Sequence, residues 1–271
     1  MNEKRIAYVI LIIYSFLTII PFYWTLITSF KAEDDIFSEN TDFFPKPTLK
    51  YYKSLLTEKP EIEKYTYNSF TIAVIVAALS LILSIPAGFG FGRYKNWIHN
   101  LSFGIILGSR LLPSIAFIVP FAIIYSKLNL IDTKFGLIAA HLFFALPFSI
   151  WLLEGFYASI PYEIEEAAKI DGCNKFQIFW YIDMPLVKSG IIAVIILSFL
   201  YSWWEYPFAA TLMRRVNLTL PVGIVQIYKD DFVVWNFVAA ATIISAIPGV
   251  LFSVFFQRFM VAGMTQGSVK E

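Results

Sequence analysis

Residues 165–190 read EEAAKIDGCNKFQIFWYIDMPLVKSG and form a polar interruption between two long apolar runs. Just upstream, Ser159 and Pro161 give a signal for the start of a helix. Acidic side chains follow in the first turn, where the positive end of the helix dipole favours negative charge. They are Glu163, Glu165 and Glu166. The pattern predicts a short helix with an acidic beginning.

The rest of this stretch predicts a turn and a second short helix. Gly172 can adopt the left-handed conformation that ends the first helix, and Asn174 can cap the second. Pro185 is predicted to end the second helix. Ala167 and Ala168 leave a small step that lets the backbone of another protein approach closely. We interpret the stretch as a helix-turn-helix at a membrane surface, with an ordinary amphipathic connector as the alternative.

The composition indicates a membrane protein. Of the 271 residues, 58% are hydrophobic and 15% are charged. Soluble domains contain about 45–50% apolar and about 25% charged residues. The net charge of +1 gives no field that would attract nucleic acid. Cys173 is the single cysteine, so no disulfide can form within this chain.

Six apolar runs are long enough to cross a bilayer core, which requires roughly 20 helical residues. We expect spans at residues 6–30, 70–91, 101–125, 135–157, 191–213 and 237–256. Residues 31–64 are predicted to form a partly ordered external loop, and residues 159–188 a loop on the inner side. The predicted fold is an all-α membrane protein with one transmembrane domain that covers residues 1–271.

The sequence offers little for catalysis. No G-x-x-x-x-G-K-[ST] motif occurs, so we do not expect this chain to bind nucleotide through a P-loop. His99, His141 and Cys173 are too dispersed to predict a metal cage or a Cys-His nucleophile. We expect no enzymatic activity, no cofactor and no metal in this chain. Transport would draw its energy from a partner or from an ion gradient.

Charged residues inside the apolar runs are better indicators of function, because a charge in the membrane is costly and usually faces a cavity or a partner. We interpret Arg110 and Glu154 as residues with structural roles. Glu205 belongs to an aromatic cluster whose ring faces and carboxylate fit the wall of a sugar pathway. This predicted pathway cluster comprises Trp203, Trp204, Glu205 and Tyr206. Aromatic packing against a partner subunit is an equal alternative.

The inner loop resembles the EAA loop of ABC importer permeases, whose pattern is E-A-A-x3-G-x9-I-x-L-P. This chain has Glu166-Ala167-Ala168, then Gly172, Ile182 and Met184-Pro185, so that only the leucine differs. In that family the loop is a coupling helix that docks in a cleft of a cytoplasmic ATPase. The resemblance implies that Glu166 faces a basic residue of the ATPase. It implies coupling roles for Glu163, Glu165, Glu166, Ala167, Ala168, Asp171, Gly172 and Pro185.

Weaker motifs follow in the same order over most of the chain, including residues 28–31, 130–133, 147–151 and 160–161. They are most similar to carbohydrate-uptake permeases of the maltose or glycerol-phosphate type, and to the smaller of the two paired permeases. Residues 263–270 are similar to a family tail that reaches the ATPase interface. The resemblance therefore implies ATPase contacts by Thr265, Gln266 and Gly267.

The resemblance implies a permease subunit that forms half of the translocation pathway of an ATP-driven importer for a carbohydrate, expected to be an oligosaccharide. The implied partners are a second homologous permease, an ATPase dimer that carries ATP and Mg, an external solute-binding protein, the carbohydrate and membrane lipid. The implied location is the cytoplasmic (inner) membrane of a bacterium or archaeon. Both termini would be cytoplasmic.

The distribution of charge gives no support to this orientation. The predicted inner segments carry nine Lys and Arg residues and the outer segments carry eleven, whereas cytoplasmic loops normally carry the excess. Lys4 and Arg5 before the first span favour an inner N-terminus.

Three other functions are compatible with parts of the sequence. A gradient-driven secondary transporter would use Glu205 as its ion-coupling carboxylate. An ABC permease could carry a solute other than a sugar. A membrane-embedded enzyme would require a polar catalytic cluster once the helices are packed.

Overall fold

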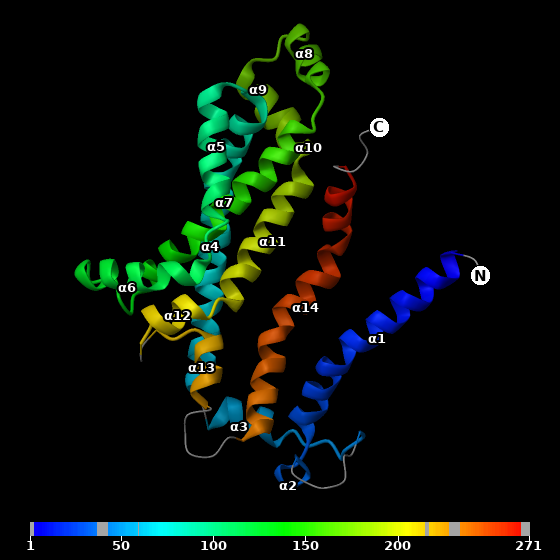
Figure 1. Ribbon diagram of the computed structural model, residues 1–271, viewed down its shortest axis with the longest axis vertical. Coiled ribbons are helices and arrows are strands. Elements are labelled where there is room, and N and C mark those ends of the chain that lie inside the picture. Colours follow the sequence, from blue (N-terminus) through cyan, green and yellow to red (C-terminus); the bar gives the residue numbers. More distant parts are fainter. Residues whose placement is uncertain (1–2, 37–42, 59, 215–216, 228–233, 267–271) are drawn as a thin grey trace. The chain divides into compact units, whose positions relative to one another are not determined.

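The computed structural model describes residues 3–36, 43–58, 60–214, 217–227 and 234–266 (Figure 1). Every regular element within those ranges is a helix, which confirms the predicted all-α fold. The chain divides into two compact units, and each is described by itself. Unit 1 comprises residues 1–65 and 220–249, and unit 2 comprises residues 66–219 and 250–271.

Unit 1 contains the first helix of the chain and the region predicted as an external loop. Its elements are α1 (Glu3–Phe30), α2 (Glu33–Ile36), α3 (Lys50–Thr57), the start of α4 (Pro60–Arg93), α13 (Leu220–Ile227) and the first part of α14 (Trp235–Gln266). Asn236 donates a buried hydrogen bond to the Lys31 carbonyl at 2.6 Å, and the Tyr51 ring packs edge-on against Phe237. The described part of the predicted loop 31–64 thus contains two helices and the beginning of α4.

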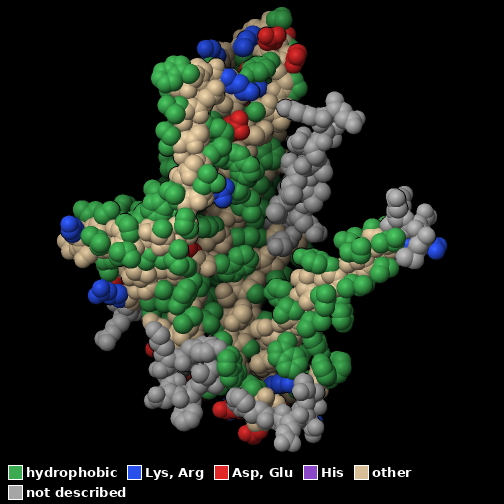
Figure 2. Space-filling view, in the orientation of Figure 1, with side chains coloured by type: hydrophobic (Ala, Val, Ile, Leu, Met, Phe, Trp, Pro, Cys, Tyr) green, Lys and Arg blue, Asp and Glu red, His purple; other side chains and the backbone are tan. Residues whose placement is uncertain are grey.

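Unit 2 contains the remaining helices. They are most of α4, α5 (Trp97–Ser109), a short 3-10 turn (Ser114–Phe117), α6 (Ile118–Lys127), α7 (Lys134–Ala158), α8 (Tyr162–Ile170), α9 (Lys175–Ile178), a π-helical turn (Phe179–Asp183), α10 (Met184–Leu186), α11 (Lys188–Trp204), α12 (Pro207–Leu212) and the last part of α14. Figure 1 shows α8 and α9 beyond the joined ends of α7 and α11, with α6 and α12 toward the opposite end of this unit. Charged side chains gather around α8, whereas the sides of the unit are mainly hydrophobic (Figure 2).

Four helices of the described residues, α1, α4, α7 and α14, are long and apolar enough to cross a membrane. Two bent pairs bring the number to six if each pair is one span. The chain turns by 89° between α5 and residues 114–127, and by 68° between residues 175–186 and α11. The first bend interrupts the predicted run 101–125, and the predicted run 191–213 is interrupted between the end of α11 at Trp204 and the start of α12 at Pro207. Proline lies at both of these interruptions, because Pro113 has an extended ψ of 125° and Pro207 begins α12.

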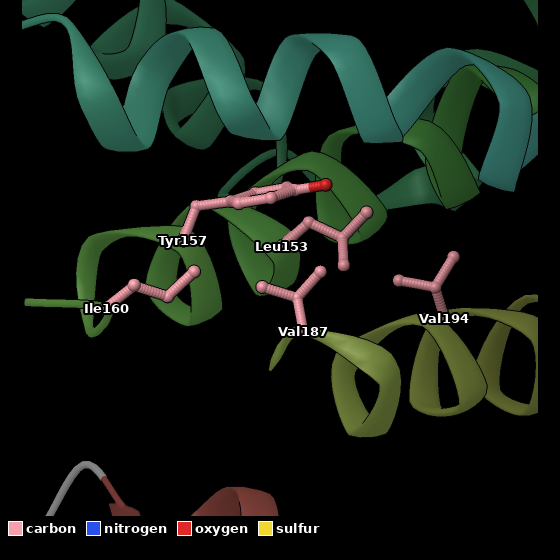
Figure 3. Close-up of a cluster of buried hydrophobic side chains, with 5 residues drawn as sticks. All are labelled: Leu153, Tyr157, Ile160, Val187 and Val194. Atoms are coloured by element: carbon pink, nitrogen blue, oxygen red, sulfur yellow. The ribbon is translucent and has the colours of Figure 1, made fainter. Parts of the chain in front are cut away.

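The core of unit 2 lies between α7 and its neighbours α4 and α11. A cluster of five buried side chains from the end of α7 and the beginning of α11 fills this space, namely Leu153, Tyr157, Ile160, Val187 and Val194 (Figure 3). Glycines permit the close helix contacts. A Cβ atom on Gly88 would lie 2.7 Å from the Leu153 Cβ, and one on Gly92 would lie 2.8 Å from the Tyr157 Cβ. Small residues four positions apart give membrane helices this close approach.

This contact predicts that valine substitutions at two glycines of α4 differ in their effect on stability. Gly92→Val should destabilise the protein by about 1–3 kcal/mol relative to Gly90→Val, because overpacking a filled interface has that cost. A Cβ atom on Gly90 meets nothing within 4 Å, so this variant controls for the change in helix propensity. The measurement is thermal unfolding of the purified protein in detergent. Equal midpoints would contradict the proposed steric limit.

Candidate functional site

The first helix of the loop 159–188 ends as its sequence predicts. Gly172 has a φ of +88°, the left-handed conformation that glycine adopts most readily. The Cys173 N–H donates to the Ala168 carbonyl at 2.9 Å, and the Gly172 N–H donates to the Lys169 carbonyl at 3.1 Å. These two bonds form a Schellman motif. The end of α8 is therefore fixed by local contacts.

The second short helix begins as predicted but ends differently. Asn174 and Gln177 form a reciprocal capping box, with bonds of 2.9 and 2.8 Å between each side chain and the backbone of the other residue. Pro185 was predicted to end this helix, and that prediction was wrong. The chain passes through a π-helical turn into α10, whose second residue is Pro185, and bends only before α11. Proline is tolerated here because it lies in the first turn of α10.

The predicted coupling residues occupy different environments. Glu163, Glu166 and Asp171 are exposed, as are Ala167, Gly172 and Pro185, whereas Ala168 is buried. Glu165 turns inward, with its side chain only 12% exposed. Its Oε1 lies 2.6 Å from Nε of Arg93, the last residue of α4. The N–H group does not meet hydrogen-bond geometry, so the contact is an ion pair.

A cavity of about 780 Å³ lies within unit 2 where α5 breaks and α11 ends. Its wall is largely apolar, with aromatic side chains from α7, α11 and the segment before α12. These are Phe143, Phe144, Phe148, Tyr201, Trp204 and Tyr206. Arg110 also lines the cavity, and its guanidinium lies 4.5 Å from the centre of the Phe148 ring. Such a wall fits a ligand with apolar faces and a few polar groups.

Glu205 also lines this cavity, but its carboxylate is hydrogen-bonded within the protein. Oε1 accepts a hydrogen bond from Phe208 N at 2.7 Å, and Oε2 accepts one from Ala209 N at 3.0 Å. His141 Nε2 lies 3.1 Å from the same Oε2, and its Nδ1 lies 2.7 Å from the Ser202 hydroxyl. Glu205 therefore caps the first turn of α12 and joins it to α7 and α11.

The other members of the pathway cluster divide between wall and core. Trp204 and Tyr206 line the cavity, whereas Trp203 is 2% exposed and stacks on Phe199. Of the predicted tail contacts, Thr265 and Gln266 lie at the end of α14, and Gly267 lies outside the described residues. The functional roles of all these residues remain predictions.

Sequence reasoning missed His141 and Arg93. His141 lies far from Glu205 in the sequence, and nothing local indicates that the two side chains meet. Arg93 is one of the nine basic residues of the predicted inner segments, and no local motif distinguishes it. A cation at the boundary between an apolar run and a loop does indicate a functional or structural contact, because such a residue must find a partner or reach water. Within the described part of the chain, no group of three potential ligands could hold a metal ion.

These features define a helical membrane protein with an acidic helix-turn-helix at one end and an aromatic cavity beside two broken helices. The family described as "Binding-protein-dependent transport system inner membrane component" matches residues 84–266. The chain belongs to this family of ABC transporter permeases, which are multi-pass subunits of the inner membrane. The resemblance found in the sequence is thereby confirmed.

Three known proteins illustrate the similarity. The sulfoquinovosyl glycerol transport system permease protein SmoH of Agrobacterium fabrum is 31% identical, over 92% of this chain and 88% of SmoH. The diacetylchitobiose uptake system permease protein DasC of Streptomyces coelicolor is 29% identical, over 93% and 92%. A solved bacterial ABC transporter for import of the acidic polysaccharide alginate has a chain of the same fold. It aligns with a TM-score of 0.73 and 21% identity, over 95% of this chain and 98% of that one.

The Glu205 contacts predict a structural phenotype. Glu205→Ala should lower stability by about 1–2 kcal/mol through the lost cap, with a further loss because His141 keeps no carboxylate partner. Glu205→Gln should lose less stability, because the carbonyl oxygen of its side chain still accepts a hydrogen bond. Thermal unfolding in detergent measures the effect, with the exposed Glu163→Ala as control. An unfolding midpoint equal to that of the wild type in Glu205→Ala would refute the capping role.

Proposed function

We propose that this chain forms half of the translocation pathway of an ATP-driven importer for a carbohydrate, expected to be an oligosaccharide. The observation that carries the proposal is the loop 159–188, in which α8 carries exposed acids and both short helices have ends fixed by local contacts. The carbohydrate assignment is supported by relatives named for sulfoquinovosyl glycerol and diacetylchitobiose uptake. An oligosaccharide also suits the aromatic cavity, because ring faces pack on the C–H surfaces of sugars.

The proposed coupling surface is the exposed side of α8 and α9. Glu163 and Glu166 carry its negative charge, and Glu166 is expected to face a basic residue of the ATPase. Ile170 and Phe176 supply apolar contact area, with exposed fractions of 87% and 71%. Exposed large apolar side chains beside charges are typical of a protein interface. Gly172 fixes the angle between the two helices.

The proposed mechanism is a change of population between two states. ATP closes an ATPase dimer, the docked helices move with it, and the pathway changes from inward-facing to outward-facing. A second, homologous permease would complete the pathway, and an external solute-binding protein would deliver the sugar. ATP and Mg would be held by the ATPase. With α8 on the cytoplasmic side, an even number of spans places both termini there.

The function is tested by reconstituting the four-component importer in proteoliposomes, with radiolabelled maltose and diacetylchitobiose as probes. Uptake should require ATP and the binding protein and should persist when ion gradients are collapsed. Gly172→Val should abolish it, because a β-branched residue at positive φ is strained by about 1–2 kcal/mol and would reshape the loop. Gly172→Asn, which tolerates this conformation, should retain most uptake. Uptake that follows a proton or sodium gradient would instead identify a secondary transporter.

The cavity wall predicts a second effect on the same uptake. Trp204→Ala and Tyr206→Ala should raise the sugar concentration at half-maximal uptake about three- to tenfold, as expected for an aromatic contact of about 0.5–1.5 kcal/mol. Trp97→Ala is the matched control, because Trp97 is 73% exposed and does not line the cavity. Equal effects of all three substitutions would remove the cavity from the pathway.

A further inference from the structure

Arg93 is a buried cation held by the loop that follows α7. Its side chain is 3% exposed and pairs with Glu165. Its Nη1 donates a hydrogen bond to the Ile160 carbonyl at 2.8 Å, and its guanidinium lies 4.9 Å from the centre of the Tyr162 ring. A cation with this burial requires compensating partners. All three partners lie between the end of α7 and the first turns of α8.

The main chain of Arg93 is held by the same segment. The Tyr162 hydroxyl donates a hydrogen bond to the Arg93 carbonyl at 3.3 Å. This carbonyl is among the last four of α4, which have no partner within their own helix. Both the side chain and the backbone of one residue therefore join α4 to α8.

The end of α4 is itself fixed against α7. Gly92 precedes Arg93, and a Cβ atom added to it would lie 3.1 Å from the backbone nitrogen of Ala158. Only the absence of a side chain on Gly92 leaves room for the Ala158 backbone, so α4 and α7 are closely packed here. A displacement of α8 would therefore be passed to helices that are packed together.

We infer that Arg93 is a positioning residue for coupling, which ties α8 to α4 so that the two move together. The inference rests on the proposed function. It gives Glu165 a role different from that of its neighbours in the sequence. Glu165 holds the helix through Arg93, whereas the exposed Glu163 and Glu166 stay available to the ATPase.

A second carboxylate, that of Asp183, makes the position of α8 depend more strongly on Arg93. Asp183 is fully buried, and neither of its carboxyl oxygens has a hydrogen-bond partner among the described residues. It interacts electrostatically with both Arg93 and Glu165. Without the cation, these two interacting carboxylates would lose their shared positive partner in a poorly solvated site. Loss of Arg93 should therefore disturb α8 more than loss of Glu165.

The test uses the complete importer in proteoliposomes and measures ATP hydrolysed per molecule of maltose or diacetylchitobiose imported. Arg93→Gln should raise this ratio about tenfold, within the range by which single residues change a coupling free energy. Arg93→Lys should be intermediate, because lysine keeps the charge without the planar fork of arginine. Adding Glu165→Gln to Arg93→Gln should lower the ratio again, because one of the two opposed carboxylates is removed. The exposed Lys95→Gln is the control.

An unchanged ratio in Arg93→Gln would overturn the inference. So would a constant ratio in which uptake and hydrolysis fall together, because that result describes lost assembly. If the wild-type complex imports sugar without hydrolysing ATP, the proposed function fails before any variant is compared. If uptake by the wild type requires ATP and Arg93→Gln hydrolyses the same amount of ATP per imported sugar, only the proposed role of Arg93 fails.

A distance measurement tests the tie independently of sugar transport. Nitroxide labels at Gly90→Cys and Lys169→Cys, in a Cys173→Ser background, report the separation of α4 and α8 in the assembled complex. The labelled protein that retains Arg93 should give one narrow distribution of the distance between the labels, with and without a nucleotide analogue. Arg93→Gln should broaden it. A distribution that remains equally narrow in Arg93→Gln would show that α8 is held by other contacts.

Discussion

The close approach of α4 to α7 is the contact on which the other features of unit 2 depend. Gly88 and Gly92 bring the two backbones together, and the space between α7 and α11 is filled by the cluster around Leu153 and Tyr157. Lipid offers little driving force for helix association, so close packing of this kind supplies it. The loop at one end of α7 and the cavity along its length both take their geometry from this packing.

The features that depend on neighbouring residues could be predicted from the sequence. Gly172 ends α8 because only a few residue types adopt positive φ easily, and Asn174 begins α9 because its side chain can bond the backbone three residues on. The apolar runs also predicted where the long helices lie. Their continuity was harder to predict, because proline in a membrane helix produces either a mild kink or a sharp turn according to its surroundings.

The features that depend on tertiary contacts could not be predicted. Glu205 is predicted from the sequence to line a sugar pathway, and its buried contact with His141 emerges only when α7 packs against the end of α11. The orientation of Glu165 depends on Arg93, which comes from a helix much earlier in the chain. Helical periodicity assigns a residue to a face, but it does not reveal what that face meets. Three neighbouring acids consequently have two different environments, because Glu165 pairs with Arg93 whereas Glu163 and Glu166 are exposed.

The break between α5 and the following 3-10 turn has a consequence for water. Residues 110–113 leave the α-helix without joining another, and three of them, Arg110, Leu112 and Pro113, line the cavity. Hydrocarbon cannot satisfy backbone carbonyls released in this way, so irregular chain at membrane depth is stable only beside protein or solvent. The backbone groups of this segment must therefore be satisfied by neighbouring protein or by water in the cavity, which makes this part of the wall more polar than a regular membrane helix would.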